Sequence, residues 1–155
     1  MTVDVGSQAP DFTLPADGGG SFTLSQARGK KVILYFYPKD DTPGCTKEAC
    51  AFQESLPDFS GANATVVGVS KDDPARHDRF KAKYGLAFPL VSDADNAVCE
   101  AFGVWKEKSN YGKTYMGIER STFLIDEQGV IAKVWRKVKV DGHAAAVLAE
   151  ARKAS

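Results

Sequence analysis

The sequence predicts an α/β domain in which helices flank a mixed central sheet and a β-hairpin comes first. Two observations carry this prediction. Residues 32–37 and 64–70 are apolar runs without alternation, which is typical of central strands covered on both faces. A helical pattern follows each run, at 45–59 and at 74–84, and this order indicates parallel β-α-β units.

The N-terminal hairpin is predicted from a glycine-rich turn. Residues 11–14 and 21–24 are short extended segments, and residues 16–20 between them read Ala-Asp-Gly-Gly-Gly. Glycine supplies the positive φ that such a connection needs. No Gly-Lys-Ser or Gly-Lys-Thr follows, so we interpret the run as a turn rather than as a phosphate-binding loop.

Helix boundaries follow from capping residues and prolines. The helical stretch 45–59 carries apolar residues near helical spacing, and Pro57 is expected to kink or shorten its far end. The charged helix 74–84 is expected to begin after the aspartate pair at 72–73 and to stop at Gly85.

The C-terminal half completes the sheet. Asp93 or Asp95 is expected to cap a short helix that Gly103 ends. A final antiparallel hairpin and a closing helix make the sheet mixed. The predicted elements are a strand at 90–92, a short helix ending at Phe102, strands at 121–126 and 130–138, and an alanine-rich helix at 141–153.

Composition argues against several classes of function. The 20 basic and 20 acidic residues give a formal net charge of zero, so no global field favours nucleic acid or an anionic membrane. The strongest apolar run, 32–37, is far shorter than the roughly 20 residues that span a bilayer. Three cysteines, an odd number, favour a reducing compartment over a disulfide framework. We therefore expect a single cytoplasmic domain over residues 1–155, with no nucleic-acid or membrane partner.

The candidate reaction centre is the segment 38–50, which reads Pro-Lys-Asp-Asp-Thr-Pro-Gly-Cys-Thr-Lys-Glu-Ala-Cys. Cys45 follows a strand and opens a helical pattern, where unpaired N–H groups and the positive end of the helix dipole stabilise a thiolate. The proline, glycine and threonine around it indicate a polar loop rather than a core position. Cys50 lies five residues on, too far for a Cys-x-x-Cys motif but close enough for a disulfide if the helix yields.

Thr42 and Arg120 are the candidate polar groups around the sulfur of Cys45. Thr42 could aim its hydroxyl back across the loop toward the reaction partner of Cys45, although alone it would be an ordinary turn residue. Arg120 directly precedes the strand 121–126. There it is either an edge charge or the fixed cation that a thiolate mechanism needs.

The other candidates are assigned structural roles. Cys99 lies in an amphipathic helical stretch, where a small and weakly polar side chain usually packs. His77 and His143 have charged or helix-opening surroundings, and no spacing of cysteine and histidine closely matches a zinc site. The basic residues along 133–139 are interpreted as a solvated strand face. No metal site is therefore expected.

Several motifs, taken together, identify a family. They are Pro38, Thr42 and Cys45 in a Pro-x-x-x-Thr-x-x-Cys pattern, the cysteine five residues later, Phe88-Pro89-Leu90 with Ser92-Asp93, Gly103-Val104-Trp105 with Gly112-Lys113, and the run from Arg120 to Asp126. With these motifs the chain resembles, over nearly its whole length, peroxiredoxins of the bacterioferritin comigratory protein (peroxiredoxin Q) type. The resemblance implies a thioredoxin-like fold and reduction of hydrogen peroxide and organic hydroperoxides. It also implies a monomer that takes electrons from thioredoxin or a related dithiol donor and requires no metal, haem or flavin.

The resemblance further implies roles for the two cysteines. Cys45 corresponds to the peroxidatic cysteine, which peroxide oxidises to a sulfenic acid. Cys50 resembles the resolving cysteine of members that carry both cysteines on one helix. The two would condense to an intramolecular disulfide.

Four more residues receive roles from the same resemblance. Thr42 would hydrogen-bond the incoming peroxide, and Pro38 would shield the pocket from water. Arg120 would hold the thiolate and the peroxide oxygens, and Glu48 resembles the acidic residue that orients this arginine. Preorganised donors suit O–O cleavage, because negative charge develops on the leaving oxygen.

Two other functions remain open. A dithiol-disulfide exchanger would use the same two cysteines, but the four-residue gap between them and the presence of Thr42 and Arg120 disfavour it. A redox-sensing interaction protein would form the disulfide to switch a partner, without turnover.

Overall fold

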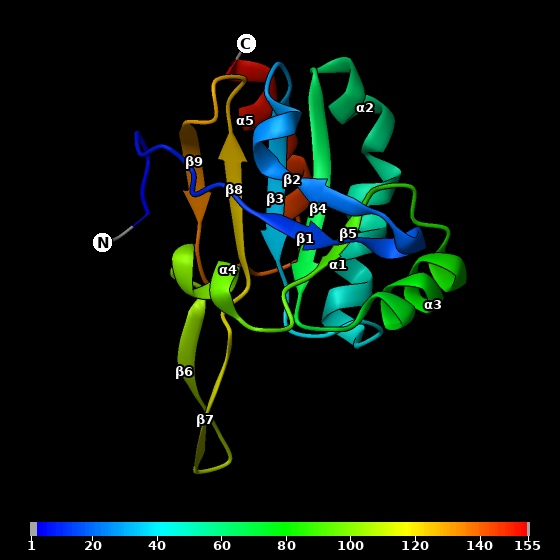
Figure 1. Ribbon diagram of the computed structural model, residues 1–155, viewed down its shortest axis with the longest axis vertical. Coiled ribbons are helices and arrows are strands. Elements are labelled where there is room, and N and C mark those ends of the chain that lie inside the picture. Colours follow the sequence, from blue (N-terminus) through cyan, green and yellow to red (C-terminus); the bar gives the residue numbers. More distant parts are fainter. Residues whose placement is uncertain (1–2, 155) are drawn as a thin grey trace.

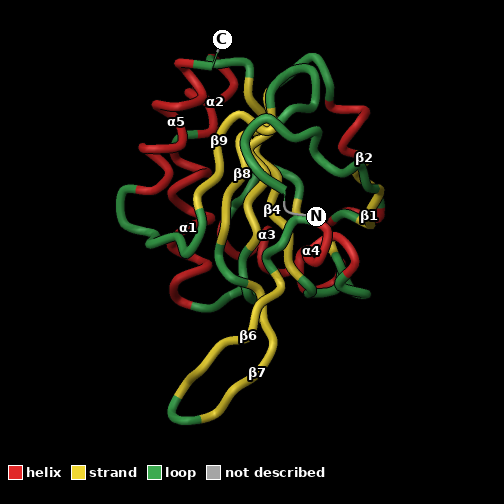
Figure 2. Tube along the Cα trace, turned by 90° about the vertical axis from the view of Figure 1, so that its left-hand side faces the viewer, coloured by secondary structure: helices red, strands yellow, loops and turns green. Residues whose placement is uncertain are grey.

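The computed structural model describes residues 3–154, and Figures 1 and 2 show it in two views. Its centre is a five-stranded sheet with the strand order β5-β4-β3-β8-β9. The pairs β3–β4 and β4–β5 are parallel, whereas the pairs β3–β8 and β8–β9 are antiparallel, so the sheet is mixed as predicted. The strands are β3 (Lys31–Phe36), β4 (Ala64–Ser70), β5 (Leu90–Ser92), β8 (Ser121–Ile125) and β9 (Ile131–Trp135).

Different layers cover the two faces of the sheet (Figure 2). One face carries α1 (Pro43–Glu54), α2 (Leu56–Gly61) and α5 (His143–Lys153). The other carries α4 (Ala97–Ala101) and the antiparallel hairpin of β1 (Thr13–Pro15) and β2 (Ser21–Thr23). α3 (Pro74–Tyr84) runs beside β5 at the edge of the sheet (Figure 1), and the short 3₁₀ turns η1 (Asp17–Gly19) and η2 (Leu24–Ala27) flank β2.

The central strand β3 serves a hydrophobic core on each face. Its side chains alternate between the two faces, as a period of two requires. Ile33 and Tyr35 pack in the core under α1 and α5, whereas Val32, Leu34 and Phe36 pack in the core under α4 and the hairpin. All side chains of β3 are buried, which is why the sequence shows an unbroken apolar run there.

The expected single helix over 45–59 is two helices. α1 begins at Pro43, two residues earlier than predicted, and ends at Glu54. Pro57 lies in the first turn of α2, where its missing N–H costs nothing. In a continuous helix its ring would clash with the carbonyl four residues earlier, so the chain breaks at Ser55 instead.

Other boundaries differ by a few residues. The helix over 74–84 is confirmed, with Asp73 as its cap and Gly85 at a φ of 65° after its end. The strand expected over 130–138 stops at Trp135, and Lys137 has a positive φ of 49°, which no strand accommodates. The closing helix starts at His143 rather than at residue 141.

A second hairpin was not predicted. β6 (Trp105–Asn110) and β7 (Lys113–Ile118) pair antiparallel and project from the body as an arm (Figures 1 and 2). Tyr111 and Gly112 form its two-residue turn, both with positive φ, and the Tyr111 side chain is almost fully exposed. Trp105 is half-buried at the base of the arm. None of the helices within residues 3–154 is long and apolar enough to cross a membrane.

Candidate active site

The start of α1 positions Cys45. The helix begins at Pro43 after Thr42, so Cys45 is its third residue. The N–H of Thr46 donates to the carbonyl of Thr42 at 2.8 Å, which makes this the first bond of the helix. The N–H groups of Gly44 and Cys45 precede that bond and have no partner within the helix. The sulfur of Cys45 therefore lies at the positive end of the helix dipole.

Cys45 is buried, which corrects the expectation of an open polar loop. Its exposed fraction is 1%, and it packs in the core that also contains Tyr35 and Phe52. The polar residues next to it in sequence suggested exposure, but the third residue of the helix faces the sheet. The thiol is therefore surrounded by protein rather than by water.

Arg120 brings a cation to this buried sulfur. Its Nη2 donates to Sγ of Cys45 at 3.3 Å, and its Nη1 donates to Oε1 of Glu48 at 2.6 Å. Glu48 lies three residues after Cys45 on α1, so both side chains occupy one side of the helix. Gly44 leaves room for the guanidinium, because a Cβ there would lie 3.2 Å from Nη2. The fold thus brings together three of the predicted residues, one of them from a distant part of the sequence.

Burial determines the charges of this cluster. It raises the pKa of Glu48 to about 7, although Arg120 acts in the opposite direction. Oε2 of Glu48 has no hydrogen-bond partner within the described residues. Burial by itself would lower the pKa of Arg120, but Glu48 and Cys45 raise it, so the guanidinium stays charged. The sulfur has a permanent cation beside it.

Thr42 and Pro38 lie on the loop that joins β3 to α1. The hydroxyl of Thr42 donates to the carbonyl of Lys39 at 2.9 Å and does not cap the helix. Pro38 is half-buried directly after Tyr37. Both predicted residues therefore border the segment that presents Cys45.

Cys50 is on the same helix but outside the cluster around Arg120. It is a free, half-buried thiol, and burial followed by the nearby charge of Glu54 raises its pKa. Five residues of α-helix separate two Cα atoms by about 8.7 Å and turn their side chains about 140° apart. The structure thus holds Cys45 and Cys50 apart.

Cys99 lies in the opposite core and is fully buried. Burial, and then the carboxylate of Asp93, raise its pKa far above the ordinary value for a thiol. Oδ2 of Asp93 accepts the N–H of Cys99 at 2.7 Å. This surrounding disfavours a thiolate, in agreement with the structural role expected from the sequence.

The two histidines are buried in hydrogen-bonded positions. Nδ1 of His77 lies 2.6 Å from Asp40 and its Nε2 lies 3.0 Å from the carbonyl of Val91. Nε2 of His143 lies 2.8 Å from Oγ1 of Thr122, and burial followed by the charge of Arg120 lowers the pKa of His143 to about 4. No group of three or more potential metal ligands occurs among residues 3–154.

Sequence reasoning did not identify Tyr35 and Gly44 as part of the site. The hydroxyl of Tyr35 is buried without a hydrogen-bond partner within the described residues, and burial followed by the charge of Glu48 raises its pKa well above the ordinary value. Tyr35 therefore stays neutral beside the cluster. Gly44 could have been found from its place directly before Cys45, whereas Tyr35 is indistinguishable in the sequence from other strand residues.

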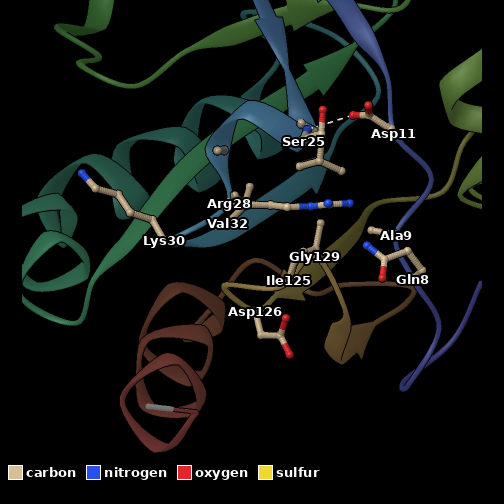
Figure 3. A pocket seen from close by; sticks show the side chains of 12 residues that line it. Gln8, Ala9, Asp11, Ser25, Arg28, Lys30, Val32, Ile125, Asp126 and Gly129 are labelled. Atoms are coloured by element: carbon tan, nitrogen blue, oxygen red, sulfur yellow. Dashed lines mark hydrogen bonds between the residues drawn. The ribbon is translucent and has the colours of Figure 1, made fainter.

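A small hollow at the other end of β3 does not serve the site. It lies around Val32 and Ile125, and the side chain of Arg28 extends across it (Figure 3). Its volume of about 10 Å³ is room for a single water molecule. A hydroperoxide substrate does not fit there.

Comparisons with known proteins show the family of this chain. The model of the AhpC/TSA family matches residues 5–134. A putative peroxiredoxin Bcp from Coxiella burnetii is 59% identical over 148 residues, covering 96% of this chain and 98% of the relative. A solved structure of the bacterioferritin comigratory protein from Xanthomonas campestris, concerned with its alkyl peroxide reduction, has a TM-score of 0.90 at 50% identity and covers 97% of this chain and 96% of that one.

A mutant of the PrxQ protein from Xylella fastidiosa is similarly close, with a TM-score of 0.93 at 44% identity over 99% of this chain and 98% of that one. These relatives also confirm the thioredoxin-like fold that the sequence motifs implied. The chain belongs to the AhpC/TSA family and is, within it, a peroxiredoxin of the bacterioferritin comigratory protein (peroxiredoxin Q) type.

Proposed function

We propose that this chain reduces hydrogen peroxide and organic hydroperoxides with Cys45 as its nucleophile. The observation that carries the proposal is the 3.3 Å contact between Arg120 and a buried sulfur at a helix start. The Cys45 thiolate attacks one peroxide oxygen, an S–O bond forms, and the O–O bond breaks. The leaving oxygen departs with the electron pair and takes a proton from solvent, and Cys45 becomes a sulfenic acid.

The neighbouring residues act on the peroxide and on the arginine. Arg120 stabilises both the thiolate and the charge that develops on the leaving oxygen, and Glu48 fixes the direction of its guanidinium. Thr42 supplies a hydroxyl that exchanges its bond to Lys39 for one to the peroxide. Pro38 limits the access of water.

Cys50 completes the cycle as the resolving cysteine. Its sulfur attacks the sulfenic acid of Cys45, a disulfide forms and water leaves. A dithiol donor such as thioredoxin then reduces the disulfide and is itself oxidised to one. The odd number of cysteines, three, supports work in the reducing cytoplasm, and the family resemblance supports a monomer.

Disulfide formation requires a change in α1. A disulfide tolerates about 7 Å between the Cα atoms at most and needs converging Cβ atoms, whereas helical geometry keeps these residues about 8.7 Å apart. The turns after Cys45 must therefore leave helical geometry when the bond forms. The change also removes the helix start that activates Cys45, so reaction with peroxide and reduction belong to two conformations of one segment.

A coupled assay tests the proposal. Peroxide should drive NADPH consumption in the presence of thioredoxin and thioredoxin reductase, and mass spectrometry of the oxidised protein should find a Cys45–Cys50 disulfide. Cys50→Ser should consume one equivalent of peroxide and then stop at the sulfenic acid or over-oxidise. A disulfide between Cys45 and Cys99 instead would overturn the assignment of Cys50. Stoichiometric oxidation without turnover would favour a redox sensor.

Hydrogen exchange tests the conformational step separately. Residues 46–53 should lose protection in the oxidised protein, whereas residues 32–37 and 65–69 in the central strands should change little. Equal protection of 46–53 in both redox states, with the disulfide verified, would contradict the unwinding of α1.

A further inference from the structure

A buried aspartate lies in the middle of the loop that joins β3 to α1. Asp40 is two residues from both Pro38 and Thr42, and its exposed fraction is only 2%. Its two carboxylate oxygens have different partners. The hydroxyl of Tyr37 donates to Oδ1, and Nδ1 of His77 on α3 lies 2.6 Å from Oδ2. Tyr37 and His77 are buried as well, so water does not compete for these bonds.

One proton must lie between Asp40 and His77. Nε2 of His77 is 3.0 Å from the carbonyl of Val91, and because a carbonyl only accepts, Nε2 carries a hydrogen. Nδ1 then faces Oδ2 of Asp40. Without a proton between them, a nitrogen lone pair and a carboxylate oxygen would repel each other in a buried site. The pair therefore keeps one proton, and this hydrogen bond ties the loop to α3.

The backbone of Asp40 connects the network to Thr42. The peptide unit between Lys39 and Asp40 accepts the hydroxyl of Thr42 at its carbonyl, at 2.9 Å. The N–H of the same unit donates to Oδ2 of Asp72 at 2.7 Å. A peptide unit is planar and rigid, so the directions of these two bonds are linked. The bonds of Asp40 therefore help to place the oxygen of Thr42, from which its hydrogen can turn to a peroxide.

Asp72 is itself held by its neighbours. Its Oδ2 accepts the hydroxyl of Ser70 at 2.8 Å, and its Oδ1 lies 3.1 Å from Nε of Arg76. Ser70 is the last residue of β4, and Arg76 lies on α3. The frame that fixes the loop is therefore built from β4 and α3, outside the helix that carries Cys45.

We propose that Asp40 is a positioning residue of the peroxide reaction, because its bonds to Tyr37 and His77 hold the loop in the place from which Thr42 meets the peroxide. It acts through Thr42 rather than on the reacting atoms. This inference rests on the proposed function in taking Thr42 as a hydrogen-bond donor to peroxide.

The alternative is that the network around Asp40 only stabilises the fold. Two neutral reagents distinguish these roles at Cys45. Hydrogen peroxide needs both the thiolate and the hydroxyl of Thr42, whereas iodoacetamide needs the thiolate alone. A displaced Thr42 therefore slows oxidation selectively, while a loosened fold changes both rates together. Mass spectrometry of the peptide that contains Cys45 measures both second-order rates.

Asp40→Ala removes the carboxylate and its bonds. We expect oxidation of Cys45 to slow by roughly ten- to a hundredfold, the order expected when a reacting group moves by about 1 Å, and alkylation to change by less than about threefold. Thr42→Val should cause the same selective loss, because it removes the hydroxyl itself. When Thr42→Val is already present, adding Asp40→Ala should slow oxidation by less than about threefold, since no hydroxyl remains to be positioned.

Two variants separate geometry from charge and from general damage to α3. In Asp40→Asn the amide can donate to a neutral Nδ1 of His77 and its oxygen can accept from Tyr37, so most of the oxidation rate should return. Asp78→Ala is the matched control, because Asp78 follows His77 on α3 but accepts the N–H of Gly18 instead. It should leave both rates within about twofold of the wild type.

Tyr37→Phe serves as the test if Asp40→Ala does not fold, because it removes a single bond to Asp40. We expect a smaller loss of oxidation rate that is again selective and again absent in the Thr42→Val background. Unchanged oxidation, equal slowing of both reagents, or effects that multiply with that of Thr42→Val would overturn the proposal and leave Asp40 a stabilising residue.

Failure of the proposed function would look different. If wild-type Cys45 were alkylated but not oxidised by peroxide, the proposed function would be wrong. If Thr42→Val oxidised at the wild-type rate, Thr42 would have no part in the reaction, and the positioning role of Asp40 would be overturned with it.

Discussion

Two cysteines on opposite sides of the central sheet are buried to the same degree but have opposite surroundings. Cys45 is 1% exposed and Cys99 is 0% exposed. Cys45 lies at the start of α1 with the guanidinium of Arg120 at 3.3 Å, whereas Cys99 lies against the carboxylate of Asp93. Burial alone raises the pKa of any thiol. The two sites therefore differ in the sign of the nearest charge rather than in accessibility, and we expect this sign to decide which cysteine reacts.

The largest expected effect comes from exchanging each sulfur for oxygen. Cys45→Ser should abolish peroxide turnover, because a serine hydroxyl does not ionise in the range where a thiol does. Cys99→Ser should turn over almost normally, since this residue has only a packing role. The coupled NADPH assay measures both. Appreciable turnover in Cys45→Ser would show that another cysteine is the nucleophile, and the comparison of Cys45 with Cys99 would then no longer explain reactivity.

The cation beside Cys45 accounts for the next largest effect. Arg120→Lys keeps the charge but replaces a planar fork, which reaches Cys45 and Glu48 together, with a single flexible donor. The rate of Cys45 oxidation should fall by roughly ten- to a thousandfold, about the loss of one preorganised donor or somewhat less. Arg136→Lys is the matched control, because Arg136 is exposed and donates to the carbonyl of Gly103 far along the chain from Cys45. Equal rates of Cys45 oxidation in Arg120→Lys and the wild type would show that Arg120 is an ordinary edge charge with no part in the reaction.

The position of Cys45 at a helix start could be predicted from sequence because the signals for it are local. The strand before it, the proline at residue 43 and the helical pattern after it all lie within about 20 residues. The same locality explains why the helix 74–84 was placed correctly, since Asp73 and Gly85 are adjacent to its ends. The burial of β3 and β4 could likewise be predicted locally, because each strand is a run of apolar residues.

The burial of Cys45 could not be predicted from its neighbours in the chain. The residue pattern alone left Arg120 open between an edge charge and a fixed cation, and only the family resemblance implied its contact with Cys45, because that contact depends on residues distant in sequence. The contact between Arg120 and Cys45 joins residues 75 positions apart, and polar neighbours in the chain give no sign of it. The β6–β7 arm was missed because most of its side chains are exposed and show no apolar alternation. Its turn, Tyr111-Gly112, also lacks the Asn-Gly or Asp-Gly composition that marks two-residue hairpins.

Glu48 and His143 are two titrating groups near Arg120, and they should make the free energy of unfolding depend on pH in opposite directions. The pKa of Glu48 is raised from 4.5 to about 7, so its contribution to stability is present below pH 4.5 and is lost as the pH rises to about 7. The pKa of His143 is lowered from 6.5 to about 4, so its contribution is present above pH 6.5 and is lost as the pH falls to about 4. Between about pH 4.5 and 6.5 the contribution of Glu48 to the free energy of unfolding falls with pH while that of His143 rises, so the two oppose each other in the wild type.

Single substitutions should separate the two slopes. Glu48→Gln leaves His143, so the free energy of unfolding should rise by about 2 kcal/mol between pH 4 and 6.5, after allowance for solvent screening. His143→Gln leaves Glu48, so the free energy of unfolding should fall by about 3 kcal/mol between pH 4.5 and 7. Urea unfolding across this pH range measures both. Parallel profiles in the two variants would show that these groups do not titrate as their surroundings indicate.

The smallest effect is expected from removing the anion beside Cys99. Oδ1 and Oδ2 of Asp93 accept the N–H groups of Val98 (3.2 Å) and Cys99 (2.7 Å), so Asp93→Asn removes one acceptor as well as the charge. We expect a loss of about 1 kcal/mol in the free energy of unfolding, as for a weakened helix cap.

The thiol of Cys99 should nevertheless stay unreactive in Asp93→Asn. Burial is the larger cause of its raised pKa, and neither an arginine contact nor the start of a long helix replaces the lost carboxylate. Peroxide should oxidise Cys99 at least roughly a hundredfold more slowly than Cys45, at a rate set by local opening of the protein. Mass spectrometry of the two cysteines in one sample gives the ratio directly. If Cys99 reacted as fast as Cys45 after this change, removal of a negative charge would suffice for reactivity, and the helix start and Arg120 would lose the role assigned to them.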